Sequence, residues 1–362
     1  MTKAGGRFSP GEPEAPPLSF GDPDREAAAA LEGSVVADRS GLGRIRMSGK
    51  DRQDLLHRLS TNEIKSLKPG EGALTALLTS RGRIVDLLHA LAGESYLTLI
   101  ASDGNAARVR SWLETYIFRE EVALEDAGAG GCLGLYGAAS ASLLDRLARD
   151  NWSSLPVAHH RRSKLAGLEV RVAGTFPLAG LGFLLLCDPG NTSALWDALV
   201  AAGAVPAGSE ALERLRIAAG VPELGKELTE DQNPWEAALD GAISLTKGCY
   251  VGQEVVARLR TYQKIQRRLG GLELEGDELP ASGSSILFAG REVGKITSAA
   301  RSPRGANGLA LGFLQVDHAG PGEAVEVSHL SGSIPARVID LPFWSPAGGA
   351  SPFLPGRDSA RG

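Results

Sequence analysis

A lysine and a cysteine stand two residues apart at the start of segment 247–258, whose sequence is KGCYVGQEVVAR. Glycines bracket Cys249 and Tyr250, and apolar residues then recur with a helical period, so we expect a tight turn that leads into a helix. A thiol just ahead of a helix N-terminus lies in partial positive charge, which favours a thiolate or a bound anion. The alternative is a buried cysteine that packs as a small apolar side chain. Lys247 is expected to contact an anionic ligand or to keep the thiol ionised, unless it is a solvated surface lysine.

An irregular segment ahead of this turn carries a second group of candidate residues. It covers residues 225–242 and contains Trp235 and Glu236. A flat aromatic face beside a carboxylate suits a planar, donor-rich heterocycle such as a pterin, whereas a tryptophan also serves simply to anchor a core. Loops held between regular elements commonly carry binding residues. Trp235 and Glu236 are therefore candidate ligand-binding residues.

Two further charged positions have structural alternatives. Glu254 and Arg258 are spaced i, i+4, and this spacing predicts a helical ion pair more readily than a catalytic pair. Asp86 interrupts an apolar strand pattern, and alternation places its side chain on the face opposite to that of Leu87. We expect Asp86 to point to solvent or into a cleft.

Several other chemistries find no support in the sequence. The three cysteines, Cys132, Cys187 and Cys249, are far apart, which predicts neither a disulfide framework nor a zinc or cluster site. Cys132 and Cys187 lie in apolar strand patterns, so we expect them to be buried. No histidine cluster has metal-ligand spacing, and the Gly-x-Ser-x-Gly pattern of serine hydrolases is absent from the sequence.

The composition indicates a globular protein of two or three domains. The chain has 362 residues, 43% of them hydrophobic, and a net charge of -5, so no broad basic surface is available for nucleic acid. No apolar run approaches the roughly 20 residues of a membrane-spanning helix. The first thirty residues are acidic and lack an apolar signal core. We therefore expect a cytoplasmic protein that binds neither nucleic acid nor membrane.

The elements that position these residues indicate an α+β architecture. Strands and helices alternate over residues 33–262 with hairpins but without a Gly-rich phosphate loop, which argues against a doubly wound parallel sheet. Residues 263–344 form short strands punctuated by Gly and Pro, as in a small β-barrel or sandwich. Residues 1–32 and 345–362 are expected to be disordered tails, the first of them closing in a short helix over residues 24–31.

The hydrophobic periods also place individual elements. Helices are expected from Asp51, from Asp103 and over residues 138–148, 192–201 and 210–219. Strands are expected at residues 73–78, 84–91, 96–101, 122–125, 132–136, 155–159, 168–173 and 181–186.

The segment Lys247-Gly248-Cys249-Tyr250-x-Gly252-Gln253-Glu254, followed by Val256-Ala257-Arg258, resembles the signature of the YgfZ family of folate-binding proteins. These proteins are relatives of the glycine cleavage T-protein and assist the maturation of iron–sulfur enzymes. Asp38-Arg39-Ser40, Pro234-Trp235-Glu236 and segment 293–298 also resemble landmarks of the family. The resemblance covers about residues 33–344.

The resemblance implies a three-lobed T-protein-like fold, in which two interleaved α+β lobes surround a central channel and a C-terminal β-barrel follows. It implies tetrahydrofolate as cofactor and iron–sulfur client or assembly proteins as partners. Cys249 would be the functional thiol, with Lys247 as its neighbour in the site. The folate-binding residues would be Trp235, Glu236, Tyr250, Gly252, Gln253, Arg258 and Asp86.

Two positions depart from the T-protein branch of this family. That branch binds the pterin with the carboxylate of an Arg-x-Glu-x-Gly helix, where this chain has Ala218. It uses an aspartate pair in its second strand, of which this chain keeps Asp86 and has Leu87 at the second position. The sequence thus favours a folate-binding accessory factor for iron–sulfur proteins. A tetrahydrofolate-dependent aminomethyl or methyl transferase is the first alternative, and a protein-binding scaffold without folate is the second.

Overall fold

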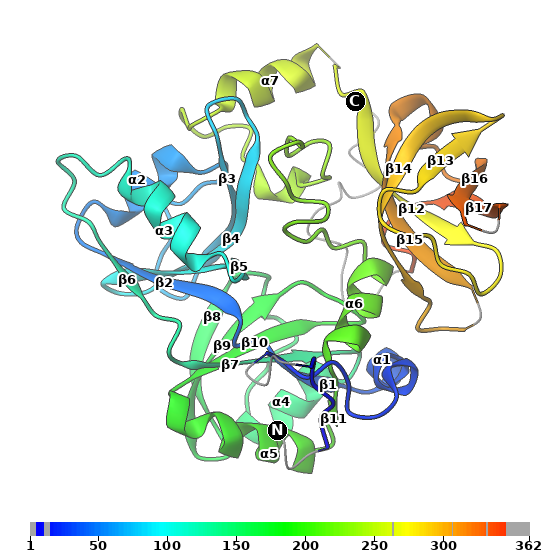
Figure 1. Ribbon diagram of the computed structural model, residues 1–362. Coiled ribbons are helices and arrows are strands. Elements are labelled where there is room, and N and C mark those ends of the chain that lie inside the picture. Colours follow the sequence, from blue (N-terminus) through cyan, green and yellow to red (C-terminus); the bar gives the residue numbers. More distant parts are fainter. Residues whose placement is uncertain (1–4, 11–14, 263, 306, 331, 345–362) are drawn as a thin grey trace.

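The computed structural model describes residues 5–10, 15–262, 264–305, 307–330 and 332–344 (Figure 1). Its α-helices are α1 (Pro23–Glu32), α2 (Arg52–Leu59), α3 (Ala106–Glu114), α4 (Ser140–Ala148), α5 (Thr192–Ala201), α6 (Ser209–Ala218) and α7 (Gln253–Thr261). The strands before the barrel are β1 (Val35–Asp38), β2 (Leu42–Ser48), β3 (Gly72–Leu78), β4 (Ile84–Ala92), β5 (Tyr96–Asp103), β6 (Ala123–Asp126), β7 (Gly131–Tyr136), β8 (His160–Leu165), β9 (Leu168–Thr175), β10 (Gly182–Cys187) and β11 (Val205–Pro206). The expected C-terminal tail, 345–362, lies outside the described residues, as do residues 1–4 and 11–14 of the expected N-terminal tail.

The first lobe is a five-stranded antiparallel sheet with the order β3-β4-β5-β2-β6. Helices α2 and α3 cover one face, to which they contribute Leu55, Leu56, Leu59, Val109 and Leu113, all at most 4% exposed. These residues recur three or four positions apart, so each helix presents one apolar stripe to the sheet. The pairing of β3 with β4 shifts in register between Leu77 and Leu78. Beyond this shift, Leu87, His89 and Leu91 lie on the face of β4 that is turned away from α2 and α3.

The second lobe is a six-stranded sheet with the order β11-β1-β7-β10-β9-β8. Helices α4 and α5 pack on one face of it, at the bottom of Figure 1. Strand β1 pairs with β7 and β11, although all five strands of the first lobe come between β1 and β7 in the chain. The two lobes are therefore interleaved, as the sequence predicts.

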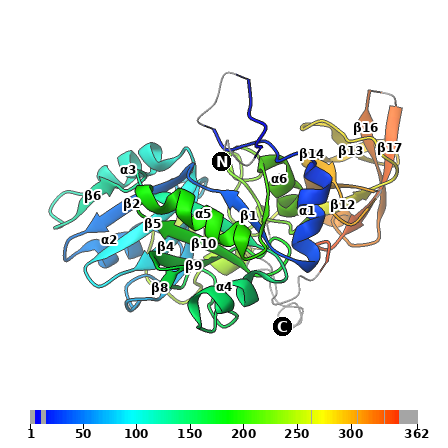
Figure 2. The same ribbon diagram turned by 90° about the horizontal axis from the view of Figure 1, so that it is seen from below.

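The N-terminal segment is ordered where the structure describes it, contrary to the expected tail. Asp22 caps α1 by accepting from the N–H groups of Asp24 and Arg25, and Pro23 occupies the first turn. Ala27 and Ala30 are completely buried, and α1 packs beside α6 (Figure 2). The prediction of a disordered segment is wrong here because the buried face of α1 consists of two alanines and Glu26, which give little hydrophobic signal. The short helix expected over residues 24–31 is confirmed.

The third lobe is a closed barrel with the strand order β12-β15-β14-β13-β16-β17. Its strands are β12 (Arg267–Leu274), β13 (Ser285–Phe288), β14 (Arg291–Arg301), β15 (Gly308–Gln315), β16 (Ala324–His329) and β17 (Gly332–Ile339). The interior contains Leu272, Ile286, Leu314, Val327 and Val338, none more than 1% exposed. The barrel flanks α6 on the side away from the five-stranded sheet (Figure 1). The predicted α+β fold of three lobes is thus confirmed.

No helix in the described part of the chain is long and apolar enough to cross a membrane.

Candidate functional site

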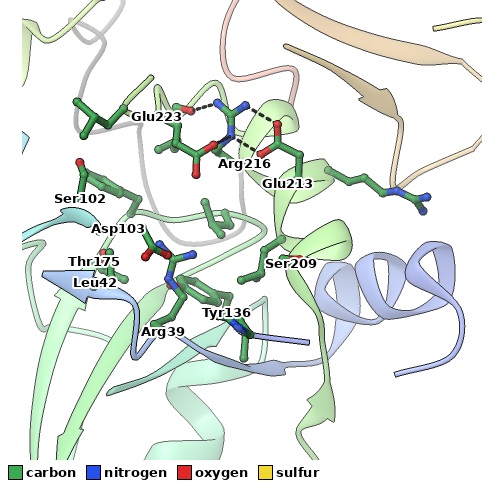
Figure 3. Close-up of a pocket in the computed structure, with 18 of the residues that line it drawn as sticks. Arg39, Leu42, Ser102, Asp103, Tyr136, Thr175, Ser209, Glu213, Arg216 and Glu223 are labelled. Carbon is green, nitrogen blue, oxygen red and sulfur yellow. Dashed lines mark hydrogen bonds and ion pairs between the residues drawn. The ribbon is translucent and has the colours of Figure 1, made fainter. Parts of the chain in front are cut away.

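A cavity of about 630 Å³ lies where the three lobes meet. Its walls come from the end of β1, the inner face of β4, the end of β5, strands β7 and β9, helix α6 and β14. Aliphatic side chains such as Leu42, Leu87 and Leu184 form much of the surface, and a smaller number of polar side chains project among them (Figure 3). A largely apolar cavity with a few convergent polar groups is typical of a small-molecule site.

Arg39 is the cation of this cavity on the side of the six-stranded sheet. It follows β1, and its backbone N–H donates to the carbonyl oxygen of Cys132 at 2.9 Å. Its side chain lies near Asp103 and Tyr136 (Figure 3), and its buried Nε atom has no hydrogen-bond partner among the described residues. Burial opposes the charge, but Tyr136 and Asp103 hold the pKa of Arg39 above its usual value. A buried donor without a partner costs free energy, and Arg39 holds such a donor beside the cavity.

Two further side chains give the cavity polar groups that are uncharged at neutral pH. Burial, with a smaller contribution from Arg39, lowers the pKa of His89 to about 4. Its Nε2 atom lies 3.1 Å from the hydroxyl oxygen of Thr175, and its ring packs on Phe176. Burial also raises the pKa of Tyr136. These groups offer hydrogen bonds to a neutral ligand without adding charge.

Asp103 ends β5 and is the cavity carboxylate near Arg39 (Figure 3). Its side chain is packed against Gly41, since a Cβ atom built on this glycine would lie 2.2 Å from the Asp103 Oδ1 atom. Asp38, another carboxylate of the cavity, is used locally because its Oδ1 accepts from the backbone N–H of Ser40 at 2.9 Å. Asp103 is thus the carboxylate beside Arg39 that this part of the cavity offers to a ligand.

Helix α6 contributes an ionic network rather than the carboxylate of the T-protein branch. Arg216 donates to Glu213 (Figure 3). It also donates to Glu227, and its Nη2 atom donates to the Ser298 hydroxyl of β14 at 2.8 Å. Desolvation opposes its charge, but the hydrogen bond with Glu213 and the charge of Glu227 raise the pKa of Arg216 above its usual value. Ala218 is completely buried in the apolar contact between α6 and the barrel. It lines no part of the cavity.

Leu87 and Asp86 lie on opposite faces of β4. Leu87 lines the cavity, so no acid projects from β4 at this position. Asp86 is 0% exposed, and its carboxylate accepts from Ser102 and from the Asn105 side chain at 2.8 Å. The expectation that Asp86 points to solvent or a cleft is wrong, because these two neighbours supply hydrogen bonds beneath α3. Burial raises its pKa, and the hydrogen bonds oppose that shift.

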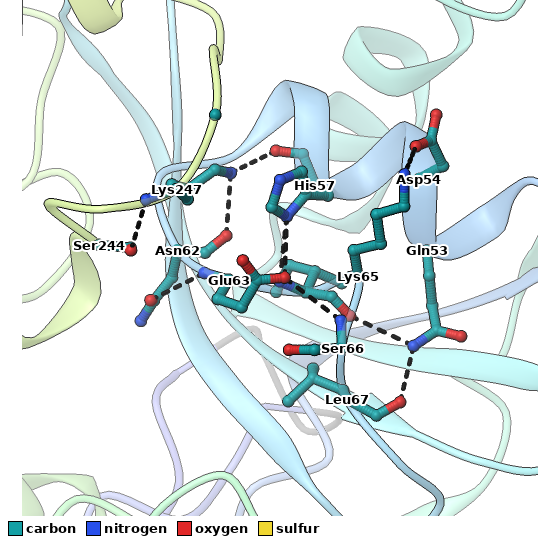
Figure 4. Close-up of polar contacts among 12 residues, drawn as sticks. Gln53, Asp54, His57, Asn62, Glu63, Lys65, Ser66, Leu67, Ser244 and Lys247 are labelled. Carbon is teal, nitrogen blue, oxygen red and sulfur yellow. Dashed lines mark hydrogen bonds and ion pairs between the residues drawn. The ribbon is translucent and has the colours of Figure 1, made fainter.

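Lys247 fastens its loop to the end of α2. Its Nζ atom donates to the carbonyl oxygens of His57, Ser60 and Asn62, the last at 2.9 Å (Figure 4). Burial lowers the pKa of Lys247 to about 8, a shift that Glu63 opposes. The hydrogen-bond donors of the ammonium are therefore directed to backbone carbonyl groups, whose C-terminal location on a helix favours a cation.

Cys249 is exposed, and its thiol has no partner in the described part of the chain. It is not part of the central cavity. Cys132 is completely buried, as expected, and burial raises its pKa to about 11. Cys187 is half-buried rather than buried. In the described ranges, no three His, Cys, Asp or Glu residues are grouped so that they would hold a metal ion.

The remaining residues of the segment and of the loop ahead of it form a packed unit apart from the cavity. Trp235 is 6% exposed and donates from Nε1 to the carbonyl oxygen of Val256 at 2.8 Å. Glu236 accepts from the Asn233 N–H and from Arg267. Burial raises the pKa of Tyr250 to about 12. The buried indole and the bonded carboxylate thus hold the loop to α7 and the barrel.

Gly252, Gln253 and Arg258 lie at α7. Gly252 has a φ of 81° and precedes the first helical residue. Gln253 donates from its amide to the Gly248 carbonyl oxygen at 3.5 Å, and Arg258 pairs with Glu254 at 2.9 Å on an exposed face. The i, i+4 ion pair is confirmed. None of the nine residues proposed for the site from the sequence lines the central cavity.

The cavity residues that the sequence did not select come from elements far apart in the chain. Arg39 lies in Asp38-Arg39-Ser40, one of the segments that resemble the family, but its spacing from other polar residues predicts no ligand. His89 offered one signal, since it is a polar residue on the same face of β4 as Leu87 and Leu91. Tyr136 and Asp103 each end a strand, but the strands belong to different sheets, so only the packing of the two sheets against each other brings them together.

Two α+β lobes and a β-barrel thus meet around a partly enclosed cavity, an arrangement typical of small-molecule sites. Residues 5–247 match the family described as GCVT N-terminal domain, and residues 267–345 match the Glycine cleavage T-protein C-terminal barrel domain. The chain belongs to the glycine cleavage T-protein family.

Relatives over nearly the whole chain carry transferase names. "Putative transferase At1g60990, chloroplastic" of Arabidopsis thaliana is 36% identical over 327 residues, which are 90% of this chain and 74% of that protein. An aminomethyltransferase of Geobacillus kaustophilus is 30% identical over 336 residues, 91% of this chain and 92% of that protein. The crystal structure of glycine cleavage system aminomethyltransferase T from Bartonella henselae covers 96% of this chain and 97% of its own, with a TM-score of 0.85 at 23% identity. That structure supports the fold.

Proposed function

We propose that this protein is a tetrahydrofolate-dependent transferase of one-carbon units, of the aminomethyl or methyl type, that works in the central cavity. The observation that carries the proposal is the unpartnered Nε atom of Arg39, buried in a largely apolar cavity of about 630 Å³. Membership of the T-protein family and the names of the relatives support the same activity.

The residues present fit a folate. The aliphatic walls suit the flat, apolar parts of such a molecule, while Arg39 offers a donor to a carboxylate or carbonyl oxygen. Neutral His89 and Tyr136 offer hydrogen bonds to ring heteroatoms. Bound tetrahydrofolate would supply the amine nitrogens that accept the one-carbon unit. We assign proton transfer to Asp103, because Leu87 provides no acid on β4 and Asp38 is bonded within its own turn.

Titration calorimetry with tetrahydrofolate tests the binding step. Arg39→Gln removes a charged donor, so we expect at least tenfold weaker binding. Arg119→Gln, an exposed arginine beyond α3, is the matched control and should change the dissociation constant less than twofold. Absence of binding by the wild type at high micromolar ligand would contradict the proposal and leave the folate-free scaffold.

Turnover with a methylamine-type donor tests the chemical step. We expect Asp103→Asn to lower the rate at least a hundredfold, the range of a lost general acid or base, and to keep folate affinity within about threefold. A rate equal to that of the wild type would exclude Asp103 from proton transfer. Folate binding without any turnover would contradict the transferase and favour an accessory role.

The narrower role as an iron–sulfur maturation factor of the YgfZ type is the second candidate. One observation favours it: Cys249 offers an exposed thiol outside the cavity, within the signature of that family. In this role the thiol meets a client cluster or assembly protein at the surface. Cys249→Ala in a strain that lacks the gene should then fail to restore iron–sulfur enzyme activity, with Cys187→Ala as the matched thiol control. Full restoration by Cys249→Ala would exclude a role for the thiol.

A further inference from the structure

A second pocket, of about 380 Å³, lies between the outer parts of the two sheets, apart from the central cavity. Four arginines line it: Arg44 and Arg46 from β2, Arg162 from β8 and Arg171 from β9. We call this site the arginine pocket. Its two carboxylates are Glu169 and Asp188, and Glu169 is already paired with Lys164 at 3.0 Å. Four guanidinium groups thus face two carboxylates in a protein whose net charge is -5.

Tyr96 contacts three of these arginines but does not offset their positive charge. Its hydroxyl oxygen accepts from Arg171 Nη2 at 2.5 Å and lies 3.4 Å from Arg162 Nη2. The guanidinium carbon of Arg46 stands 4.0 Å from the centre of its ring, and that arginine is 3.8 Å from Glu125. An uncharged phenol holds the cations in place but leaves their mutual repulsion, which a bound anion would relieve.

Two of the arginines that line this pocket carry buried donors without partners. Arg44 is 3% exposed and donates from Nη2 to the carbonyl oxygens of Ser40 and Gly128. Its Nε and Nη1 atoms have no hydrogen-bond partner among the described residues, and neither has the Nη1 atom of Arg171. Three buried nitrogens of two pocket arginines therefore lack an acceptor among the described residues, although Arg44 also lies against the Cys132 thiol, whose pKa is raised by burial and lowered by this arginine. Such groups are rare in folded proteins unless an ion, water or ligand completes them.

The remaining wall allows close approach to the backbone. Ala127, Gly130 and Gly131 line one part of it, just ahead of β7 and at its first residue, with no side chain larger than a methyl group. Besides Tyr96, the other uncharged lining residues are Thr98, Val170, Leu186 and Cys187. Guanidinium groups match the oxygen atoms of phosphate with paired hydrogen bonds, and several of them together suit a dianion better than a single carboxylate.

We propose that the arginine pocket binds a phosphate group, either as inorganic phosphate or as the phosphate monoester of a small metabolite. The site is independent of the folate cavity, so its occupancy does not depend on the proposed transferase activity. Arg44 and Arg171 contact the phosphate oxygens, Arg46 and Arg162 add charge at the mouth, and Tyr96 orients the cations.

Titration calorimetry with the full chain tests this site, using inorganic phosphate, glycerol 3-phosphate and acetate at one ionic strength and pH 7.5. We expect both phosphates to bind at least tenfold more tightly than acetate. Tighter binding of glycerol 3-phosphate would identify a phosphorylated metabolite as the source, and equal or weaker binding would identify inorganic phosphate. Acetate binding as tight as phosphate, or no binding of either phosphate at 10 mM, on the order of the weakest specific sites, would overturn the proposal.

Arg171→Gln should weaken phosphate binding at least tenfold, because it removes two charged donors. Arg291→Gln, an exposed arginine on the barrel, is the matched control and should leave the affinity within twofold. Arg44→Gln is a second variant, and circular dichroism must first show that it folds, since Arg44 also donates to the Gly128 carbonyl oxygen. An affinity for phosphate that is unchanged in Arg171→Gln would overturn the proposal.

Tungstate soaked into crystals gives an independent measurement. Anomalous density beside Arg44 and Arg171 would support the proposal.

Discussion

Arg39 and Arg44 stand five residues apart on either side of one turn, and each carries a buried guanidinium nitrogen without a partner. Arg39 projects into the central cavity, while Arg44 lines the arginine pocket. The chain crosses from one sheet to the other between them, as β1 ends and β2 begins. The short segment that connects the two sheets thus contributes one arginine to each of the two proposed binding sites.

His89 gives the protein a defined sensitivity to acid. Its pKa of about 4 in the folded state lies below the usual value of 6.5. Between pH 6.5 and 4, His89 is therefore protonated in the unfolded chain but neutral in the folded protein. The contribution of neutral His89 to the free energy of unfolding is fully present above pH 6.5 and is lost as the pH falls from 6.5 to 4. We expect the wild type to lose roughly 2 kcal/mol more than His89→Gln between pH 7 and 4.5. Urea unfolding of both proteins at the two pH values measures this difference, and equal losses would show that His89 is protonated in the native state.

Lys247 predicts a change at alkaline pH. Its pKa of about 8 in the folded state is below that of an ordinary lysine, so burial of the charged form costs free energy at neutral pH. That cost is relieved as the pH rises from 8 towards 10.5, and stability should rise over this window relative to Lys247→Met. At pH 7 the same variant leaves three carbonyl oxygens without their donor, and we expect a loss of about 3 kcal/mol in urea unfolding. Lys295→Met, an exposed lysine on β14, should change stability by less than about 0.5 kcal/mol.

At the scale of elements, the helices with a strong apolar period could be placed from the sequence. The prediction of residues 192–201 matches α5, and 210–219 differs from α6 by one residue at each end. The strand expected at 155–159 is wrong, since these residues contain only an isolated bridge between Val157 and Gly174, and β8 begins at His160. Strand β8 is an edge strand with polar residues such as Arg161 and Ser163. Its extended conformation is therefore set by its pairing with β9 and could not be predicted from its composition.

Gly252 fixes the start of α7 against the turn between β3 and β4. Its φ of 81° favours glycine, and a Cβ atom there would lie 2.7 Å from the Thr79 carbonyl oxygen. We expect Gly252→Ala to cost about 2 kcal/mol of unfolding free energy in thermal melts. Gly248→Ala is the matched control: its Cβ would meet nothing within 4 Å, and its φ is not in the left-handed region. Equal melting temperatures for the two variants would show that the turn adapts.

At the scale of the molecule, we propose that residues 33–262 and 263–344 are two folding units joined through α6. The closed barrel has its own core, and the buried Arg216–Glu227 pair connects α6 with the Ser298 hydroxyl of β14. Few features of this contact were predictable, because Ser298 is separated from Arg216 and Glu227 by a long stretch of chain and lies in another lobe. The same holds for the cavity, whose lining residues come from all three lobes.

Breaking the buried pair should loosen the barrel. Glu227 is 0% exposed and accepts from Arg216, Thr297 and Ser298. Glu227→Gln removes the fully buried carboxylate that pairs with Arg216 and leaves this guanidinium its pair with Glu213, and we expect a loss of about 3 kcal/mol together with faster proteolysis between α7 and β12. Glu230→Gln, which removes an exposed carboxylate nearby, should change neither quantity. Lost stability without faster proteolysis would mean that the lobes unfold as one.

The interleaving of the two sheets also has a consequence for synthesis on the ribosome. All strands of the five-stranded sheet lie between Leu42 and Asp126, so this sheet is complete before the first neighbour of β1 has been made. Strand β1 then waits for β7, which begins at Gly131, and for β11, which begins at Val205. At ordinary translation rates that wait is on the order of ten seconds, during which the unpaired apolar edge of β1 is open to chaperones or to aggregation.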